Sequence, residues 1–422
     1  MTLPAHLRAL ALGAALGTTL SATSALAQAP RADRPLWSER AVIARAIEHS
    51  PDVVRARAAQ YEASALATFA RVPRVGNPTV GVRAMVGVPD AAAATYALIV
   101  GIPLDVSGAR SHWSTEALWA AREAEARLDV ARNEACSAAR EAWMNAVIAT
   151  ESVRLADERR ALALSLLEAA RRRLDAQSAT ALDLALAEQS ASDAELAVVT
   201  ARREREAALS ALRTLLSLDP SHELRLPTLE APTMPAQMSR ERAAALALAH
   251  RREAAALDAS ARRLRTSTTR LHHEATAPIF VAAEVEWQGY TQASIGASAQ
   301  WSLPVALTNQ GERATADAQA RAADEQRAVA ERQVSNEAAA AWTELELRLS
   351  ELAVIERQSL PAAQRVLSLT EALFRAGTVD SYRLLRARDE LFAQQQRRVD
   401  ALRAAWRARI ALDQSTGRSL AQ

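Results

Sequence analysis

The sequence predicts a mostly α-helical protein with a small membrane β-barrel, built as a tandem structural repeat. Similar segments recur in the same order at an offset of about 200 residues. Two helical stretches are much longer than ordinary globular helices, and four short stretches alternate between apolar and polar residues. Each copy is therefore predicted to contain two strands and long coiled-coil helices.

The composition favours long helices and excludes several functions. Of the 422 residues, 51 are basic and 49 acidic, a net charge of +2 that argues against a strongly basic nucleic-acid binder. Aromatic residues make up 4 %, and 12 glycines are few for this length. The single cysteine, Cys136, allows neither an intrachain disulfide nor a cysteine-based zinc site.

Residues 1–27 have the form of a signal peptide. Arg8 precedes an apolar stretch over 9–20, and Ala25-Leu26-Ala27 fits the cleavage site. The apolar stretch is too short to cross a membrane as a helix, and the rest of the chain has no apolar run of that length. The chain is predicted to be exported without transmembrane helices.

The two copies are predicted to span residues 28–216 and 239–422. His49 matches His250 in its surroundings, and further matches follow in order along the chain. Residues 217–238 are rich in proline and are predicted to be the linker. The helical stretches expected in the two copies are 37–72, 111–176 and 180–216, then 239–275, 312–376 and 380–417.

The stretch 111–176 contains neither glycine nor proline, and as one helix it would be about 100 Å long. Apolar residues at a strict spacing of seven predict a coiled-coil seam, although alanine richness alone could generate such a stripe. Small residues at the seam allow neighbouring helices to approach closely. The seam positions are Ala121, Leu128, Ala135, Ala142, Ala149, Ala156, Ala163 and Ala170.

Four stretches alternate with the period of a strand, at 80–88, 96–104, 279–287 and 293–303. Each is long enough for a tilted strand to cross a bilayer, with Tyr96, Trp287 and Trp301 near the ends, where aromatic girdles lie. The alternative is a half-buried soluble sheet packed on a helix. In the membrane interpretation the lumen-facing candidates are Arg83, Glu284 and Glu286.

Strands can span lipid only as a closed barrel, because every backbone polar group must be paired there. Four strands cannot close a barrel, since about eight is the practical minimum. Several chains must therefore contribute strands to one barrel. With four strands from each chain, the barrel could have eight, twelve or sixteen strands. The long helices would continue this barrel away from the membrane.

The chain resembles the TolC family of outer-membrane efflux proteins. The resemblance is carried by the repeat, by the strand exits Ile102-Pro103-Leu104 and Leu303-Pro304-Val305, and by the turn that begins Phe374-Arg-Ala-Gly377 and continues through Ser381 and Leu385. It implies a homotrimer with a twelve-stranded β-barrel that continues into an α-helical barrel. It also places the protein in the outer membrane of a Gram-negative bacterium, in contact with its lipid and with a long periplasmic part.

The family resemblance further implies a passive exit duct of a tripartite efflux system. The expected partners are other copies of the chain, a periplasmic adaptor and an inner-membrane pump of the RND type. The CzcC-like branch, which exports heavy-metal cations, is favoured weakly. The alternatives are drug efflux, type I secretion and an exported soluble coiled-coil structural protein.

The family resemblance also points to a closed periplasmic tip. Gln177 stands where glycine is usual, and Arg383 and Arg386 stand where acids are usual. We therefore expect Asp183 of one helical hairpin to pair with one of these arginines in the adjacent hairpin, with Asp380 as a second acid. The tip and gate candidates are Asp183, Phe374, Gly377, Asp380, Arg383 and Arg386.

Neither an enzyme nor a cofactor-binding protein is predicted, since no phosphate-binding loop or hydrolase motif is present. His272 and His273 invite a metal hypothesis, but adjacent side chains on a helix point about 100° apart and chelate poorly together. They are interpreted as a polar cluster at the membrane boundary, and no metal site is predicted.

Overall fold

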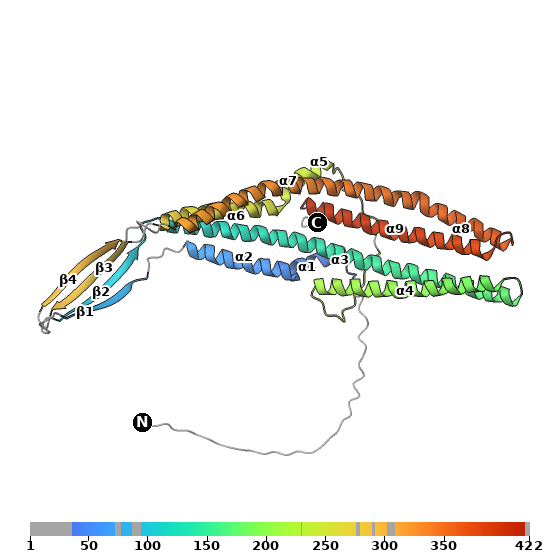
Figure 1. Cartoon of the computed structure of the whole chain (residues 1–422), viewed down its shortest axis with the longest axis horizontal. Helices are drawn as coiled ribbons and strands as arrows, with labels where there is room; N and C mark the ends of the chain where they lie inside the picture. Colours follow the sequence, from blue (N-terminus) through green and yellow to red (C-terminus); the bar gives the residue numbers. More distant parts are fainter. Residues whose placement is uncertain are drawn as a thin grey trace, which may run out of the picture.

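The computed structural model describes residues 36–71, 77–86, 94–228, 230–275, 279–288, 292–301 and 309–417. The predicted signal peptide, residues 1–27, lies outside these ranges, as does the second strand exit at 303–305. The molecule is elongated, with a sheet at one end, two helical hairpins at the other and a bundle of helices between them (Figure 1).

The two copies contain the same series of elements. The first comprises α1 (Glu39–His49), α2 (Pro51–Ala70), β1 (Thr79–Met85), β2 (Thr95–Leu104), α3 (Ala109–Asp175) and α4 (Ala181–Leu215). The second comprises α5 (Arg240–His250), α6 (Arg252–Glu274), β3 (Ile279–Gln288), β4 (Gln292–Trp301), α7 (Gln310–Val354), the π-helix η1 (Ile355–Ser359), α8 (Leu360–Arg375) and α9 (Ser381–Ser415).

The first predicted helical segment of each copy consists of two helices. Ser50, which precedes Pro51, has a ψ of 131°, because the proline ring disfavours the helical conformation of the residue before it. Arg251 makes the equivalent break in the second copy with a ψ of 128°. Its guanidinium contacts Glu253 at 2.8 Å and also pairs with Glu337 of α7, so the break is tied to a neighbouring helix.

Helix α3 is a single α-helix of 67 residues, and it packs against α2, α4, α6 and α9. Leu128, Ala135, Ala149, Ala156 and Ala163 of the predicted seam are buried within one chain, and the other seam positions are partly buried. The spacing of seven therefore marks the face of α3 that contacts its neighbours.

The second long helical stretch is not one α-helix. Residues 355–359 form the π-helix η1, which separates α7 from α8 and is followed by Pro361. A proline has no N–H group to donate to the preceding turn, and a wider turn accommodates this loss. The corresponding part of α3 lacks proline and runs without interruption.

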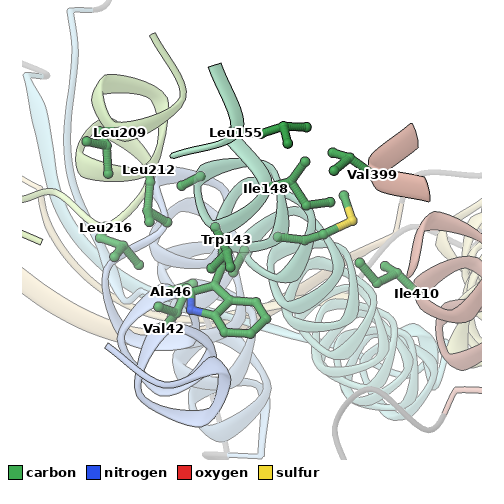
Figure 2. Close-up of a cluster of buried hydrophobic side chains, with 14 residues drawn as sticks. Val42, Ala46, Trp143, Ile148, Leu155, Leu209, Leu212, Leu216, Val399 and Ile410 are labelled. Atoms are coloured by element: carbon green, nitrogen blue, oxygen red, sulfur yellow. The ribbon is translucent and has the colours of Figure 1, made fainter. Parts of the chain in front are cut away.

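The main hydrophobic core lies midway along the molecule, where α1, α3, α4 and α9 meet. Figure 2 shows Trp143 and Ile148 of α3 surrounded by side chains from the other three helices. The indole N–H of Trp143 donates to the carbonyl oxygen of Trp37 at 2.8 Å, which fixes the entry of the chain into α1. The first and second copies thus share one core.

A buried ion cluster joins the two copies beside this core. Arg140 of α3 is 6 % exposed and contacts Asp413 of α9 at 2.8 Å and Glu39 of α1 at 2.5 Å. Asp413 is 1 % exposed and also pairs with Arg409 at 2.9 Å. Removing one partner of such a cluster leaves an uncompensated charge away from water.

Asp413→Asn is expected to destabilise the protein by about 3 kcal/mol, because Arg140 and Arg409 both lose a buried counter-charge. The change is measured as a shift in urea unfolding of the purified protein in detergent, followed by circular dichroism. Asp400→Asn is the control, since its pair with Arg403 at 3.4 Å is exposed and worth only about 0–1 kcal/mol. Equal shifts for the two variants would contradict a stabilising role for the buried cluster.

Candidate functional site

The four strands form one antiparallel sheet in the order β1-β2-β3-β4. One face is apolar: Val82, Leu98, Val285 and Ile295 are aligned across the sheet, and side chains of aligned residues share a face. Val82 is 79 % exposed and Ile295 84 % exposed. An apolar sheet face of this extent open to the surroundings indicates a membrane or protein contact.

The opposite face carries the charged residues that the sequence analysis singled out. Arg83 is aligned with Ala97, which is aligned with Glu286, and Glu284 lies two residues before Glu286 on the same face. The Arg83 guanidinium lies 3.2 Å from a Glu284 carboxylate oxygen and 3.9 Å from one of Glu286. The structure therefore brings all three predicted lumen residues together, with two carboxylates to one guanidinium.

Aromatic side chains mark both ends of the apolar face. Tyr96 and Trp287 are aligned partners at the end far from the helices, whereas Trp301 is aligned with Ile279 at the helix end. All three aromatic residues are exposed. This distribution is that of side chains at the two boundaries of an apolar layer.

Each end strand of the described sheet has a neighbour on one side only. β1 pairs with β2 and β4 pairs with β3, so one edge of β1 and one edge of β4 have no partner strand among the described residues. The unpaired backbone groups at such edges are a template for another strand.

At the opposite end of the molecule, α3 and α4 form one hairpin and α8 and α9 form the other (Figure 1). The turns pass through a left-handed residue, which is Gln177 with a φ of 53° in the first hairpin and Gly377 with a φ of 73° in the second. The left-handed conformation ends a helix and suits glycine, so Gln177 adopts it at a modest steric cost.

Asp183 connects the two hairpins. It forms a capping box with Thr180 at the start of α4, and its other carboxylate oxygen accepts a hydrogen bond from Ser381 of α9 at 2.5 Å. Ser381 is the main cause that lowers the pKa of Asp183 to about 2, and Thr180 adds to it. Within the chain, therefore, Asp183 is bound by hydroxyl and backbone groups, not by the expected Arg383 or Arg386.

A second contact between the hairpins involves Phe374, whose ring lies 5.0 Å from the guanidinium carbon of Arg173. Arg173 was not singled out from the sequence, and Ser381 was named only as part of the turn that carries the family resemblance. The capping-box pattern Thr180-x-x-Asp183 was readable as a helix start, but nothing local to the sequence indicates that Ser381 lies opposite it.

Asp380 and Arg383 have a local role at the start of α9. The Asp380 carboxylate accepts from the backbone N–H of Arg383 at 2.9 Å, as the N-cap of the helix. The side chains of Arg383 and Arg386 are exposed and have no ion-pair partner among the described residues of the chain.

His273 packs with a histidine from the first repeat of the same chain. Its ring is stacked on that of His112, with 4.6 Å between centroids, and His272 meets it edge-on at 6.0 Å. The Nδ1–H of His273 donates to the carbonyl oxygen of Ser107 at 2.7 Å. Across the described ranges, no three His, Cys, Asp or Glu side chains are arranged to hold a metal ion.

None of the helices in the described ranges is both long and apolar enough to cross a membrane.

Several solved structures share this fold. The chain is 16 % identical to the CusC channel, covering 92 % of this chain and 95 % of CusC at a TM-score of 0.75. It is 18 % identical to the outer membrane protein VceC of Vibrio cholerae, covering 90 % and 96 % at a TM-score of 0.73. It is also 18 % identical to the MtrE outer membrane channel of Neisseria gonorrhoeae, covering 90 % and 88 % at a TM-score of 0.71.

The fold is thus that of solved outer-membrane channels. The family model described as Outer membrane efflux protein matches residues 42–217 and 236–418, and the chain belongs to this family. The two matched segments confirm the tandem repeat, and no curated protein matches the chain. The protein is an outer-membrane efflux channel of the TolC type and not an enzyme.

Ser381→Ala is expected to raise the pKa of Asp183 from about 2 towards its ordinary value, because the largest stabilising contact of the ionised form is lost. The contact stabilises the tip at pH values above about 4 and is lost as the pH falls towards 2, since the folded pKa lies below the unfolded one. Carbon-13 NMR titration of labelled aspartate measures this directly.

Ser368→Ala is the control for this titration, since that hydroxyl donates only to Arg365 of its own helix. An unchanged Asp183 pKa in Ser381→Ala would mean that the cross-hairpin bond is absent in solution.

Proposed function

We propose that three copies of this chain form the exit duct of a tripartite efflux system of the RND type. The unpaired edges of β1 and β4 carry this proposal, because a four-stranded sheet in lipid would leave backbone groups without partners. Three sheets joined edge to edge would give the twelve-stranded barrel that the family resemblance implies. The helices would then extend the duct through the periplasm.

In this assembly the exposed apolar face would contact outer-membrane lipid, and the face with Arg83, Glu284 and Glu286 would line the lumen. A leader of residues 1–27 would be removed, leaving repeats over 28–216 and 239–422. A periplasmic adaptor and an inner-membrane pump would supply recognition and energy at the end where the hairpins lie. The contacts of Asp183 and Phe374 would hold that end closed.

The assembly is tested by extraction from outer-membrane fractions. The proposal expects a detergent-stable trimer whose mass is measured by light scattering, together with channel conductance in planar bilayers. Recovery as a soluble periplasmic monomer would overturn it.

Val82→Arg is expected to abolish insertion into the outer membrane, because an arginine on the lipid face near the bilayer midplane costs about 2–4 kcal/mol. Thr79→Arg is the matched control, since Thr79 lies on the opposite face of the same strand. The amount of trimer in the outer membrane is measured by immunoblotting. Equal loss for both variants would mean that the two faces are assigned wrongly.

We further propose that the cargo is cationic, with heavy-metal cations as the favoured class. The polar face of the sheet supports this, because rings of glutamates favour cations in channels and each chain contributes two carboxylates to one guanidinium. Organic drugs and secreted polypeptides are the alternative cargoes.

Glu284→Gln combined with Glu286→Gln is expected to lower the ratio of cation to anion permeability below one, because the lumen face keeps only the positive Arg83. Arg83→Gln is expected to raise the same ratio. Both are measured as reversal potentials across a bilayer under a potassium chloride gradient. Equal ratios in all variants would place the selective region elsewhere.

A further inference from the structure

The two internal repeats can be aligned residue by residue along their long helices. Trp143 of α3 donates its indole N–H to the carbonyl oxygen of the residue before the N-cap of α1. Trp342 of α7 makes the same bond, at 3.0 Å, to the residue before the N-cap of α5. These tryptophans are therefore equivalent, which sets an offset of 199 residues between α3 and α7. Helices α4 and α9 begin at Ala181 and Ser381, an offset of 200, and the wider turn of η1 accommodates the additional residue.

One face of α3 and the equivalent face of α7 are buried alike. Ala139, Ala146 and Val153 of α3 are buried, and so are the residues at the same offset in α7. The buried equivalents are Ala338, Leu345 and Leu352. In α7 this face packs on α5 and α9 of the same repeat, so the offset aligns the two helices correctly.

A second apolar face is buried in α3 but open in α7. Ile148 and Leu155 of α3 are buried with Val399 of α9, where the first repeat meets the second (Figure 2). In α7 the equivalent residues are Leu347 and Val354, and both are exposed. Leu347 is 59 % exposed, whereas Ile148 is 2 % exposed. The second repeat thus presents to its surroundings the face that the first repeat covers.

The partner of this face is also present twice. Val399 of α9 corresponds to Val199 of α4 at the offset of 200. Val399 is 4 % exposed, whereas Val199 is 58 % exposed. The described chain therefore holds each half of the contact twice. One pair of halves meets within the chain, and the other pair, Leu347 with Val354 and Val199, is exposed.

We propose that Leu347 and Val354 of one chain pack on Val199 of the neighbouring chain and so join adjacent chains midway along their helices. The inference rests on the proposed three-copy duct, in which first and second repeats alternate around a ring. Each second repeat then meets the first repeat of the next chain, and the exposed equivalent faces are the ones that meet. The partner is a second copy of this chain, because the chain itself supplies both complementary halves in one register.

The contact between chains lacks the ion cluster of the contact within the chain. That cluster pairs an arginine of α3 with an acid of α1 and an acid of α9. At the equivalent positions stand an alanine of α7, an arginine of α5 and an arginine of α4. These residues are Ala339, Arg240 and Arg213. An arginine introduced at position 339 would therefore meet two cations in place of two acids.

Proximity is tested by disulfide cross-linking of the full-length protein in outer-membrane fractions. Leu347→Cys combined with Val199→Cys is expected to give covalent dimers and trimers on oxidation. The native thiol does not interfere, because Cys136 is buried. The control is Leu347→Cys with Gln189→Cys, since Gln189 is exposed but lies about 15 Å from Val199 along α4, beyond the reach of a disulfide.

The register is tested by charge. Ala339→Arg is expected to lower the ratio of trimer to monomer by about tenfold, because it adds a guanidinium beside Arg213 and Arg240. Ala353→Arg is the control, since its equivalent Arg154 is exposed and pairs within α3. Ala339→Arg combined with Arg213→Asp and Arg240→Glu rebuilds the cluster and should return the ratio towards the wild-type value. The ratio is measured by light scattering in detergent.

The outcomes separate this inference from the proposed function. A wild-type protein that stays monomeric would overturn the duct and the inference with it. A trimer in which the Val199 pair cross-links no better than the Gln189 control would overturn only the contact between chains. Equal ratios for Ala339→Arg and Ala353→Arg, or a triple variant that recovers nothing, would overturn the register.

Discussion

The rest of the molecule depends on the two open edges of its sheet. Within the part of the chain that the structure describes, β1 and β4 each have a neighbouring strand on one side only, and lipid offers no water to satisfy the backbone groups of the other side. The apolar face adds a second demand, since residues such as Val82 and Ile295 are exposed when the chain stands alone. In the proposed duct both demands are met by strands of neighbouring chains in the membrane, so folding of the sheet and formation of the channel would be one event.

The long helices extend the molecule from the sheet to the tip. α3 extends from the end of the sheet to the tip and contacts helices of both copies along its length. Its alanine seam permits close packing, and the Arg140 cluster fixes α1 and α9 against it at mid-length. A rod that is anchored at its centre can keep a rigid middle while its far end remains adjustable.

Features that depend on a repeat of two or seven residues along the chain were predictable from the sequence. Alternation placed Arg83, Glu284 and Glu286 on one face, and the heptad spacing located buried positions such as Leu128 and Ala156. Contacts between segments far apart in the chain were not predictable. Neither the bond from Ser381 to Asp183 nor the stacking of His112 on His273 has a local sequence signature, because each depends on how two hairpins or two copies are aligned.

The sheet and the hairpin tips differ in how much free energy a single change costs. At the sheet, a single misplaced charge costs several times the thermal energy, because lipid cannot solvate it. At the tip, the hairpins are joined by a hydroxyl-to-carboxylate bond and a cation–π contact, both only partly buried and each worth about 1 kcal/mol. Contacts of this size can be broken by a binding partner without unfolding α4 or α9, whereas the sheet cannot open at comparable cost. A change of state in the proposed duct would therefore be confined to the tip, where Arg383 and Arg386 have no ion-pair partner among the described residues.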